Sequence, residues 1–197
     1  MIARLVGSEM CIRDRPVSGK EIFELIGTPN NATSKGTASV NKDVIDNYID
    51  EVKSKNIQSK KDKIKVVIDC GNGAAGVIAP KLFTALGFNV VEIYSEVDGN
   101  FPNHHPDPGN PENLKDLSDK VLSEKANIGL AFDGDGDRLG VIDNEGKIIP
   151  QDKFLMLLAK DILKNSPKAK IIFDVKCTNR LKDVILGYGG EPIMSPT

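Results

Sequence analysis

Short apolar runs separated by helix-length segments organise most of this chain. Three of these runs have the length of strands, and the first is rich in β-branched residues. They are Lys63–Asp69, Val90–Tyr94 and Ile128–Phe132. Residues 74–87, after the first run, are typical of a helix, and Asn110 and Pro111 cap another before the third run. Strands that alternate with helices predict a parallel sheet with helices on its faces.

A hairpin follows the third run. Gly140–Ile142 and Lys147–Ile149 flank the turn sequence DNEG, which adds an antiparallel edge to the sheet. A second series of helix, strand, helix and strand begins near residue 151, with its strands at 170–175 and 191–194 and a Thr178 cap on its second helix. We therefore predict the α/β class, with mixed, mainly parallel sheets and flanking helices.

The residues before this regular part have a different character. Ser18 and Glu21 form a capping-box pair at the start of a short helix, and another helix is expected over residues 42–54. Between them, residues 27–41 are rich in Gly, Ser, Thr and Asn. Composition favours equally an exposed linker and a long surface loop within one domain.

The first fifteen residues fit no periodic pattern. The run LVGSEMCIRDR at 5–15 resembles the translation of a transposon-end sequencing adapter. We therefore expect residues 1–15 to be an adapter-derived artefact, so that Cys11 carries no chemistry. The true start of the protein is expected to be missing.

Composition excludes several classes of protein. The net charge is −2, which argues against a nucleic-acid surface or an anionic membrane surface. No apolar run reaches the roughly 20 residues that span a bilayer. Three widely spaced cysteines indicate a reducing compartment rather than a disulfide scaffold. These features predict a cytoplasmic protein without nucleic-acid or membrane partners.

Three aspartates separated by glycines follow the strand that ends at Phe132. Asp133, Asp135 and Asp137 alternate along the chain, so an extended loop directs their carboxylates to one side. Without a cation they repel one another and their pKa values rise. Carboxylate oxygens suit Mg²⁺, and the adjacent Arg138 is well shaped for a phosphate. The sequence predicts a magnesium site with Asp133, Asp135 and Asp137 as ligands, at a carboxyl end of the sheet.

Other interpretations of this loop remain open. An EF-hand also begins with spaced aspartates, but its sixth position would be Arg138 instead of glycine and its twelfth Asn144 instead of glutamate. A solvated acidic turn and the aspartyl-phosphate site of a phosphatase are further alternatives. Elsewhere, the loop Gly71–Gly76 is either a phosphate cradle or a tight turn between strand and helix. His104 and His105 are either metal ligands or part of a structural loop together with Asp107.

Four long runs identify a resemblance to a known family. They are VVIDCGNGAAG at 66–76, EVDGNFPNHHPDPGNPENL at 96–114, GLAFDGDGDRLGVI at 129–142 and IIFDVKCTNRL at 171–181. The chain resembles the α-D-phosphohexomutases, in their bacterial phosphomannomutase/phosphoglucomutase branch. The resemblance implies the end of a first domain and a linker at 16–41, a complete metal-binding domain at 42–148 and the start of a third at 150–197.

The resemblance also implies a reaction. A phosphoserine exchanges its phosphoryl group with a mannose or glucose 1- or 6-phosphate through a bisphosphorylated sugar, with Mg²⁺ held by the three aspartates. Arg138 and Lys176 are implied as catalytic-site residues, the lysine on substrate. No serine here is followed by His-Asn-Pro, the family's phosphoserine motif, so this chain by itself is expected to be inactive.

Two alternatives are a phosphoglucosamine mutase and a non-catalytic module that binds metal or sugar phosphate. Neither sugar preference nor oligomeric state follows from the sequence.

Overall fold

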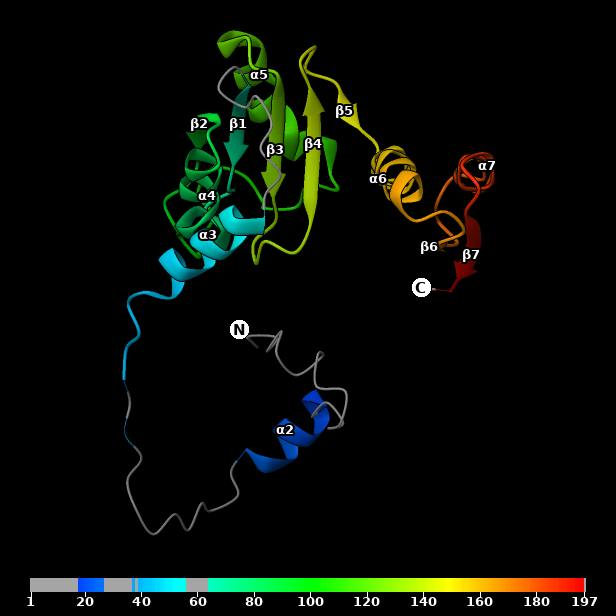
Figure 1. Cartoon of the computed structure of the whole chain (residues 1–197). Coiled ribbons are helices and arrows are strands. Elements are labelled where there is room, and N and C mark those ends of the chain that lie inside the picture. The colour runs from blue at the N-terminus through cyan, green and yellow to red at the C-terminus, as the bar shows by residue number, and fades with distance from the viewer. Residues whose placement is uncertain (1–17, 27–36, 38, 56–63, 197) are drawn as a thin grey trace. The chain divides into compact units, whose positions relative to one another are not determined.

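The computed structural model describes residues 18–26, 37, 39–55 and 64–196 (Figure 1). The chain divides into two units, and the second begins at Lys42. In the first, α2 (Gly19–Leu25) has the predicted capping box, because the Ser18 hydroxyl accepts from the Glu21 amide and the Glu21 carboxylate accepts from the Ser18 amide at 2.8 Å. The predicted artefact at 1–15 and most of the segment 27–41 lie outside the described residues.

The second unit contains a five-stranded sheet. Its strands are β1 (Lys65–Asp69), β2 (Asn89–Ile93), β3 (Ile128–Phe132), β4 (Leu139–Asp143) and β5 (Ile148–Ile149). They lie in the order β2-β1-β3-β4-β5. β1 pairs in parallel with β2 and β3, whereas β3–β4 and β4–β5 are antiparallel. The predicted parallel sheet with an antiparallel edge is confirmed.

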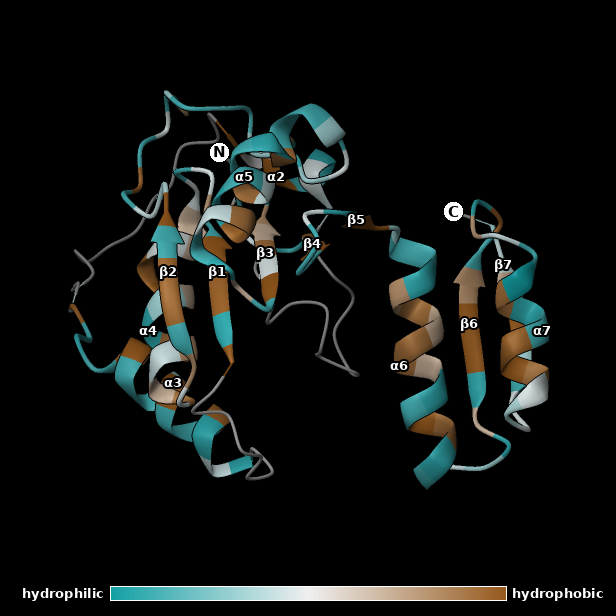
Figure 2. Ribbon diagram, turned by 90° about the horizontal axis from the view of Figure 1, so that it is seen from above, coloured by the Kyte–Doolittle hydropathy of each residue, from teal (hydrophilic) through white to brown (hydrophobic). Residues whose placement is uncertain are grey.

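Both faces of this sheet are covered. Successive β1 side chains point to opposite sides, so β1 contributes to the core on each face. Val66 and Ile68 face a cluster that includes Ala79 of α4 (Ala79–Ala85). Val67 faces the opposite cluster with Leu117 of α5 (Lys115–Glu124). Figure 2 shows hydrophobic residues along β1, β2 and β3. The β-branched run of β1 is thus explained by burial on two sides.

The helices differ in detail from the prediction. α3 (Val44–Lys55) lies where it is expected, but the predicted helix over 74–87 is wrong as a single element. It consists of the 3₁₀ helix η1 (Ala74–Val77) followed by α4, with Pro80 in the first turn of α4. Proline lacks an amide hydrogen and clashes with the preceding turn, so one helix cannot continue through it. Asn110 caps the 3₁₀ helix η2 (Pro111–Leu114), which leads into α5.

A separate two-stranded parallel sheet lies in residues 151–196. The elements are α6 (Gln151–Asn165), β6 (Lys170–Asp174), α7 (Arg180–Gly187) and β7 (Glu191–Ser195). Their core contains Leu163, Phe173 and Leu181. The predicted Thr178 cap is wrong, because α7 is preceded by Asn179 and has no side-chain cap. The domain boundaries at 42–148 and 150–197 stay predictions.

Among the described residues, no helix combines the length and the apolar character needed to cross a bilayer.

Candidate metal centre

The aspartate loop joins β3 to β4 at the carboxyl ends of the parallel strands β1 and β3. It turns between Phe132 and Leu139, and its amides bond back within the turn. The Gly136 amide donates to the Asp133 carbonyl at 3.1 Å, and the Gly136 φ is +79°. A side chain is strained at that φ, so glycine is needed here to close the turn. This connection fixes where the three aspartates lie.

The three predicted ligands lie together. One carboxylate oxygen from each of Asp133, Asp135 and Asp137 lies within 4.8 Å of the others. Asp133 is buried at 2% exposure, whereas Asp135 and Asp137 are exposed. The centre therefore has one fixed carboxylate at its base and two that face solvent.

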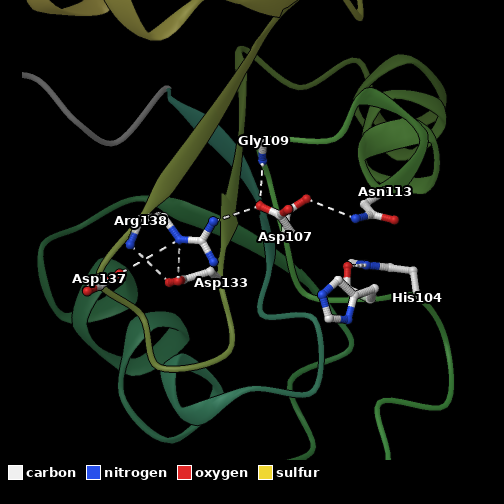
Figure 3. A network of polar contacts seen from close by, with 8 residues as sticks. His104, Asp107, Gly109, Asn113, Asp133, Asp137 and Arg138 are labelled. Atoms are coloured by element: carbon white, nitrogen blue, oxygen red, sulfur yellow. Dashed lines mark hydrogen bonds and ion pairs between the residues drawn. The ribbon is translucent and has the colours of Figure 1, made fainter. Parts of the chain in front are cut away.

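Arg138 donates hydrogen bonds to two carboxylates and also forms a longer ion pair with Asp137, at 3.9 Å (Figure 3). Its Nε donates to Asp133 Oδ2 at 2.8 Å, and its backbone amide donates to Asp133 Oδ1 at 2.9 Å. On its other side, the Arg138 Nη1 donates to Asp107 Oδ1 at 2.8 Å. A planar guanidinium presents its donors in a fixed fork, so two partners fix its direction. The Arg138 side chain as a whole is 58% exposed.

The surroundings shift the pKa values of two of the aspartates in opposite directions. Repulsion from Asp135, and then from Asp133, raises the pKa of Asp137, as the sequence predicts. The same prediction is wrong for Asp133. Burial alone raises the pKa of Asp133, but hydrogen bonds from Arg138 outweigh it and the pKa falls below its usual range. Asp133 is therefore the carboxylate that Arg138 holds in place.

Asp107 is a site residue that sequence reasoning placed only in a structural loop. Its carboxylate accepts from the Gly109 amide at 3.1 Å, and its carbonyl accepts from Asn113 Nδ2 at 2.9 Å (Figure 3). These two contacts orient Asp107 independently of Arg138. The two residues are 31 positions apart, and the sequence carries no signal that links them.

His104 belongs to a structural contact. Its Nε2 lies 3.0 Å from Oδ2 of the buried Asp69, and its Nδ1 lies 3.0 Å from the His105 carbonyl. Among the described residues, the possible metal-binding group contains aspartates alone, without His104 or His105. The structure favours the structural-loop interpretation of this histidine pair.

Lys176 lies in the turn after β6. Its side chain is exposed, and its backbone amide donates to Asp174 Oδ1 at 2.6 Å. The turn is therefore ordered by a local contact that does not involve the ammonium group. Its catalytic role stays a prediction.

The donor set fits a hard divalent cation. Opposite ligands about 2.1 Å from one Mg²⁺ are roughly 4.2 Å apart, and the three carboxylate oxygens already lie within 4.8 Å. The EF-hand interpretation is wrong, because this loop joins two antiparallel strands instead of two helices. Three carboxylates beside an oriented arginine can hold a cation and receive a phosphate.

Comparison with known families gives one domain match. Residues 46–146 match the model described as phosphoglucomutase/phosphomannomutase, alpha/beta/alpha domain II. This range contains the whole five-stranded sheet except its last strand, and all of the aspartate loop.

Similar proteins carry names of the same family. The phosphomannomutase/phosphoglucomutase of Pseudomonas aeruginosa PAO1 is 56% identical over 168 residues, which are 85% of this chain and 36% of that protein. The phosphoglucomutase of Neisseria gonorrhoeae is 45% identical over 97% of this chain and 42% of its own length. A phosphoglucomutase/phosphomannomutase family structure from Burkholderia thailandensis has a TM-score of 0.75 at 49% identity, covering 78% of this chain and 33% of that one. The chain thus spans about two fifths or less of these relatives.

Proposed function

This chain belongs to the phosphoglucomutase/phosphomannomutase family, and we propose that it supplies the metal-binding segment of a mutase that interconverts hexose 1-phosphates and 6-phosphates. One observation carries the proposal. Three carboxylates converge at the carboxyl end of the sheet beside an arginine that two aspartates orient. Phosphoryl transfer needs positioning and charge stabilisation, and this arrangement provides both.

Each residue has a distinct role in this proposal. Asp133, Asp135 and Asp137 hold Mg²⁺, which supplies positive charge to the phosphoryl oxygens. Arg138 directs its accessible edge to the same phosphate, because Asp133 and Asp107 take its Nε and one Nη1 donor. Lys176 binds substrate.

The wider proposal follows the relatives' names. We propose a mannose or glucose phosphate as substrate, and a phosphoserine outside this sequence as the group that exchanges the phosphoryl. A cytoplasmic location is part of the same proposal.

A chimera tests this function. The aligned 168-residue segment of this chain would replace its counterpart in the P. aeruginosa relative. The chimera is expected to convert mannose 1-phosphate and glucose 1-phosphate to the 6-phosphates in a coupled assay. Asp135→Asn in the chimera should reduce turnover strongly, because one of three metal ligands loses its charge. Asp119→Asn, which removes an exposed carboxylate on α5, is the matched control.

A folded chimera without turnover, or one in which Asp135→Asn is as active as Asp119→Asn, would contradict the proposed function. Circular dichroism of each protein establishes that the compared variants are folded.

A further inference from the structure

We propose that the loop between β1 and η1 sets the spacing of the aspartate loop, with Gly73 as the positioning residue. The inference rests on the proposed metal centre and deepens it. It assigns a role in metal selectivity to a glycine that binds neither metal nor substrate.

Gly73 is buried directly against the aspartate loop. A Cβ on Gly73 would lie 2.8 Å from the Gly134 carbonyl oxygen, 2.9 Å from Gly134 Cα and 3.1 Å from the Asp133 carbonyl oxygen. All three are backbone atoms of the metal loop, so no flexible side chain can move aside. Any residue other than glycine at 73 must displace the chain that carries Asp133 and Asp135.

Space, not backbone conformation, requires this glycine. The Gly73 φ and ψ are −88° and −177°, which is extended backbone open to any residue. The glycine is therefore explained by the close approach of two loops. This contrasts with Gly136 in the metal loop, where a φ of +79° requires glycine by itself.

A hydrogen bond joins the same two loops. The Ala74 amide donates to the Gly134 carbonyl at 3.0 Å, and the Gly73 amide donates to the Cys70 carbonyl at 2.7 Å. The second bond ties the loop to the end of β1, whose residues are almost fully buried. The buried end of β1 therefore helps to fix the position of Gly134. The first bond also means that the Ala74 amide is engaged within the protein, against the phosphate-cradle interpretation of this turn.

The chemical consequence concerns which cation the centre prefers. Mg²⁺ demands near-octahedral ligands at about 2.0–2.1 Å, whereas Ca²⁺ accepts variable geometry at about 2.3–2.6 Å. A loop held at fixed spacing favours the smaller ion. Displacing it weakens Mg²⁺ binding more than Ca²⁺ binding.

The test uses the 197-residue chain and Mn²⁺, whose free form is measured by electron paramagnetic resonance, with Mg²⁺ and Ca²⁺ as competitors. We expect Gly73→Ala to weaken Mg²⁺ binding about tenfold, as changes beside metal ligands do, and to weaken Ca²⁺ binding much less. Gly99→Ala is the control, because a Cβ there meets nothing within 4 Å. The ratio of the two affinities is the readout, since a simple loss of folded protein lowers both equally.

Ala74→Pro provides a second variant. Proline is tolerated at the first position of a helix, and Gly73 already has the extended backbone that precedes proline. The change removes the amide that donates to Gly134 and should shift the affinity ratio in the same direction.

The outcomes separate the two proposals. A wild-type chain that binds no Mn²⁺ contradicts the metal centre itself. A wild-type chain that binds Mn²⁺, with the Mg²⁺ to Ca²⁺ ratio unchanged in folded Gly73→Ala and Ala74→Pro, overturns the role of Gly73 and leaves the centre standing.

Discussion

Arg138 meets Asp133 through a local contact and Asp107 through a distant one. The local contact follows from adjacency in the loop, because the Asp133 carboxylate receives both the backbone amide and Nε of Arg138. The distant contact depends on how the loop before η2 crosses the end of the sheet. Sequence patterns predict the first kind of neighbour and carry no signal for the second.

The same limit explains the pKa of Asp133. Spacing alone predicts repulsion among the three aspartates, which holds for Asp137. The hydrogen bonds from Arg138 reverse the outcome at Asp133. Charge counting along the chain cannot reveal which carboxylate is buried and bonded.

Asp69 makes the stability of the fold depend on pH. It is fully buried, and burial raises its pKa above the ordinary 3.8 in spite of hydrogen bonds from Gly71 and His104. An acid whose pKa is raised on folding contributes stability at low pH that is lost as the pH rises through the folded-state pKa. Asp69→Asn cannot ionise, so the stability of wild type relative to this variant should fall as the pH rises from about 4 toward neutrality.

Urea unfolding of both proteins across that pH range measures the difference. It should amount to about 1.4 kcal/mol for each unit by which the pKa is raised. A wild-type stability that rises relative to Asp69→Asn with increasing pH would contradict the prediction.

At the scale of elements, periodicity locates most strands and helices because burial repeats along them. β3 matches its predicted bounds, and β1 and α3 differ from theirs by about two residues or fewer at each end. The sequence pattern misses the break between η1 and α4. Apolar residues can keep helical spacing across a point where the backbone hydrogen bonds of the helix are interrupted. Pro80 was the available signal.

α5 offers a packing prediction. Leu117 is 0% exposed and lies in the cluster between α5 and the sheet, whereas Leu122 on the same helix is 49% exposed. Leu117→Ala should lower the free energy of unfolding by about 2–5 kcal/mol, because it removes buried methyl groups and leaves a cavity. Leu122→Ala should change it by less than about 1 kcal/mol. Denaturant unfolding of the two variants provides the comparison. Similar losses of unfolding free energy in both would contradict the packing of Leu117 against the sheet.

In the whole molecule, the family assignment places the aspartate loop within a longer protein. The relatives are more than twice as long as the part that aligns with this chain. The α/β class and the parallel sheet with its antiparallel edge follow from patterning, whereas the reaction requires resemblance to a family. The geometry of the three aspartates and Arg138 is compatible with a cation and a phosphate.

The 197-residue chain by itself should not turn over mannose 1-phosphate or glucose 1-phosphate. Its sequence contains no Ser-His-Asn-Pro run, and the proposed reaction needs a serine that carries the exchanged phosphoryl group. A coupled assay of hexose 6-phosphate formation measures this, with the P. aeruginosa relative as the positive control. Turnover that tracks with the purified chain would show that a different nucleophile acts.

Asp133, Asp135 and Asp137 are proposed to form a divalent metal centre. Mn²⁺ binding to the chain, with Mg²⁺ as competitor, tests it most directly. We expect the wild type and Asp119→Asn to bind one Mn²⁺ that Mg²⁺ displaces, and Asp135→Asn to bind it at least about tenfold more weakly. Equal affinities for Asp135→Asn and Asp119→Asn, or no Mn²⁺ bound by the folded wild type, would rule out a metal centre at these three aspartates.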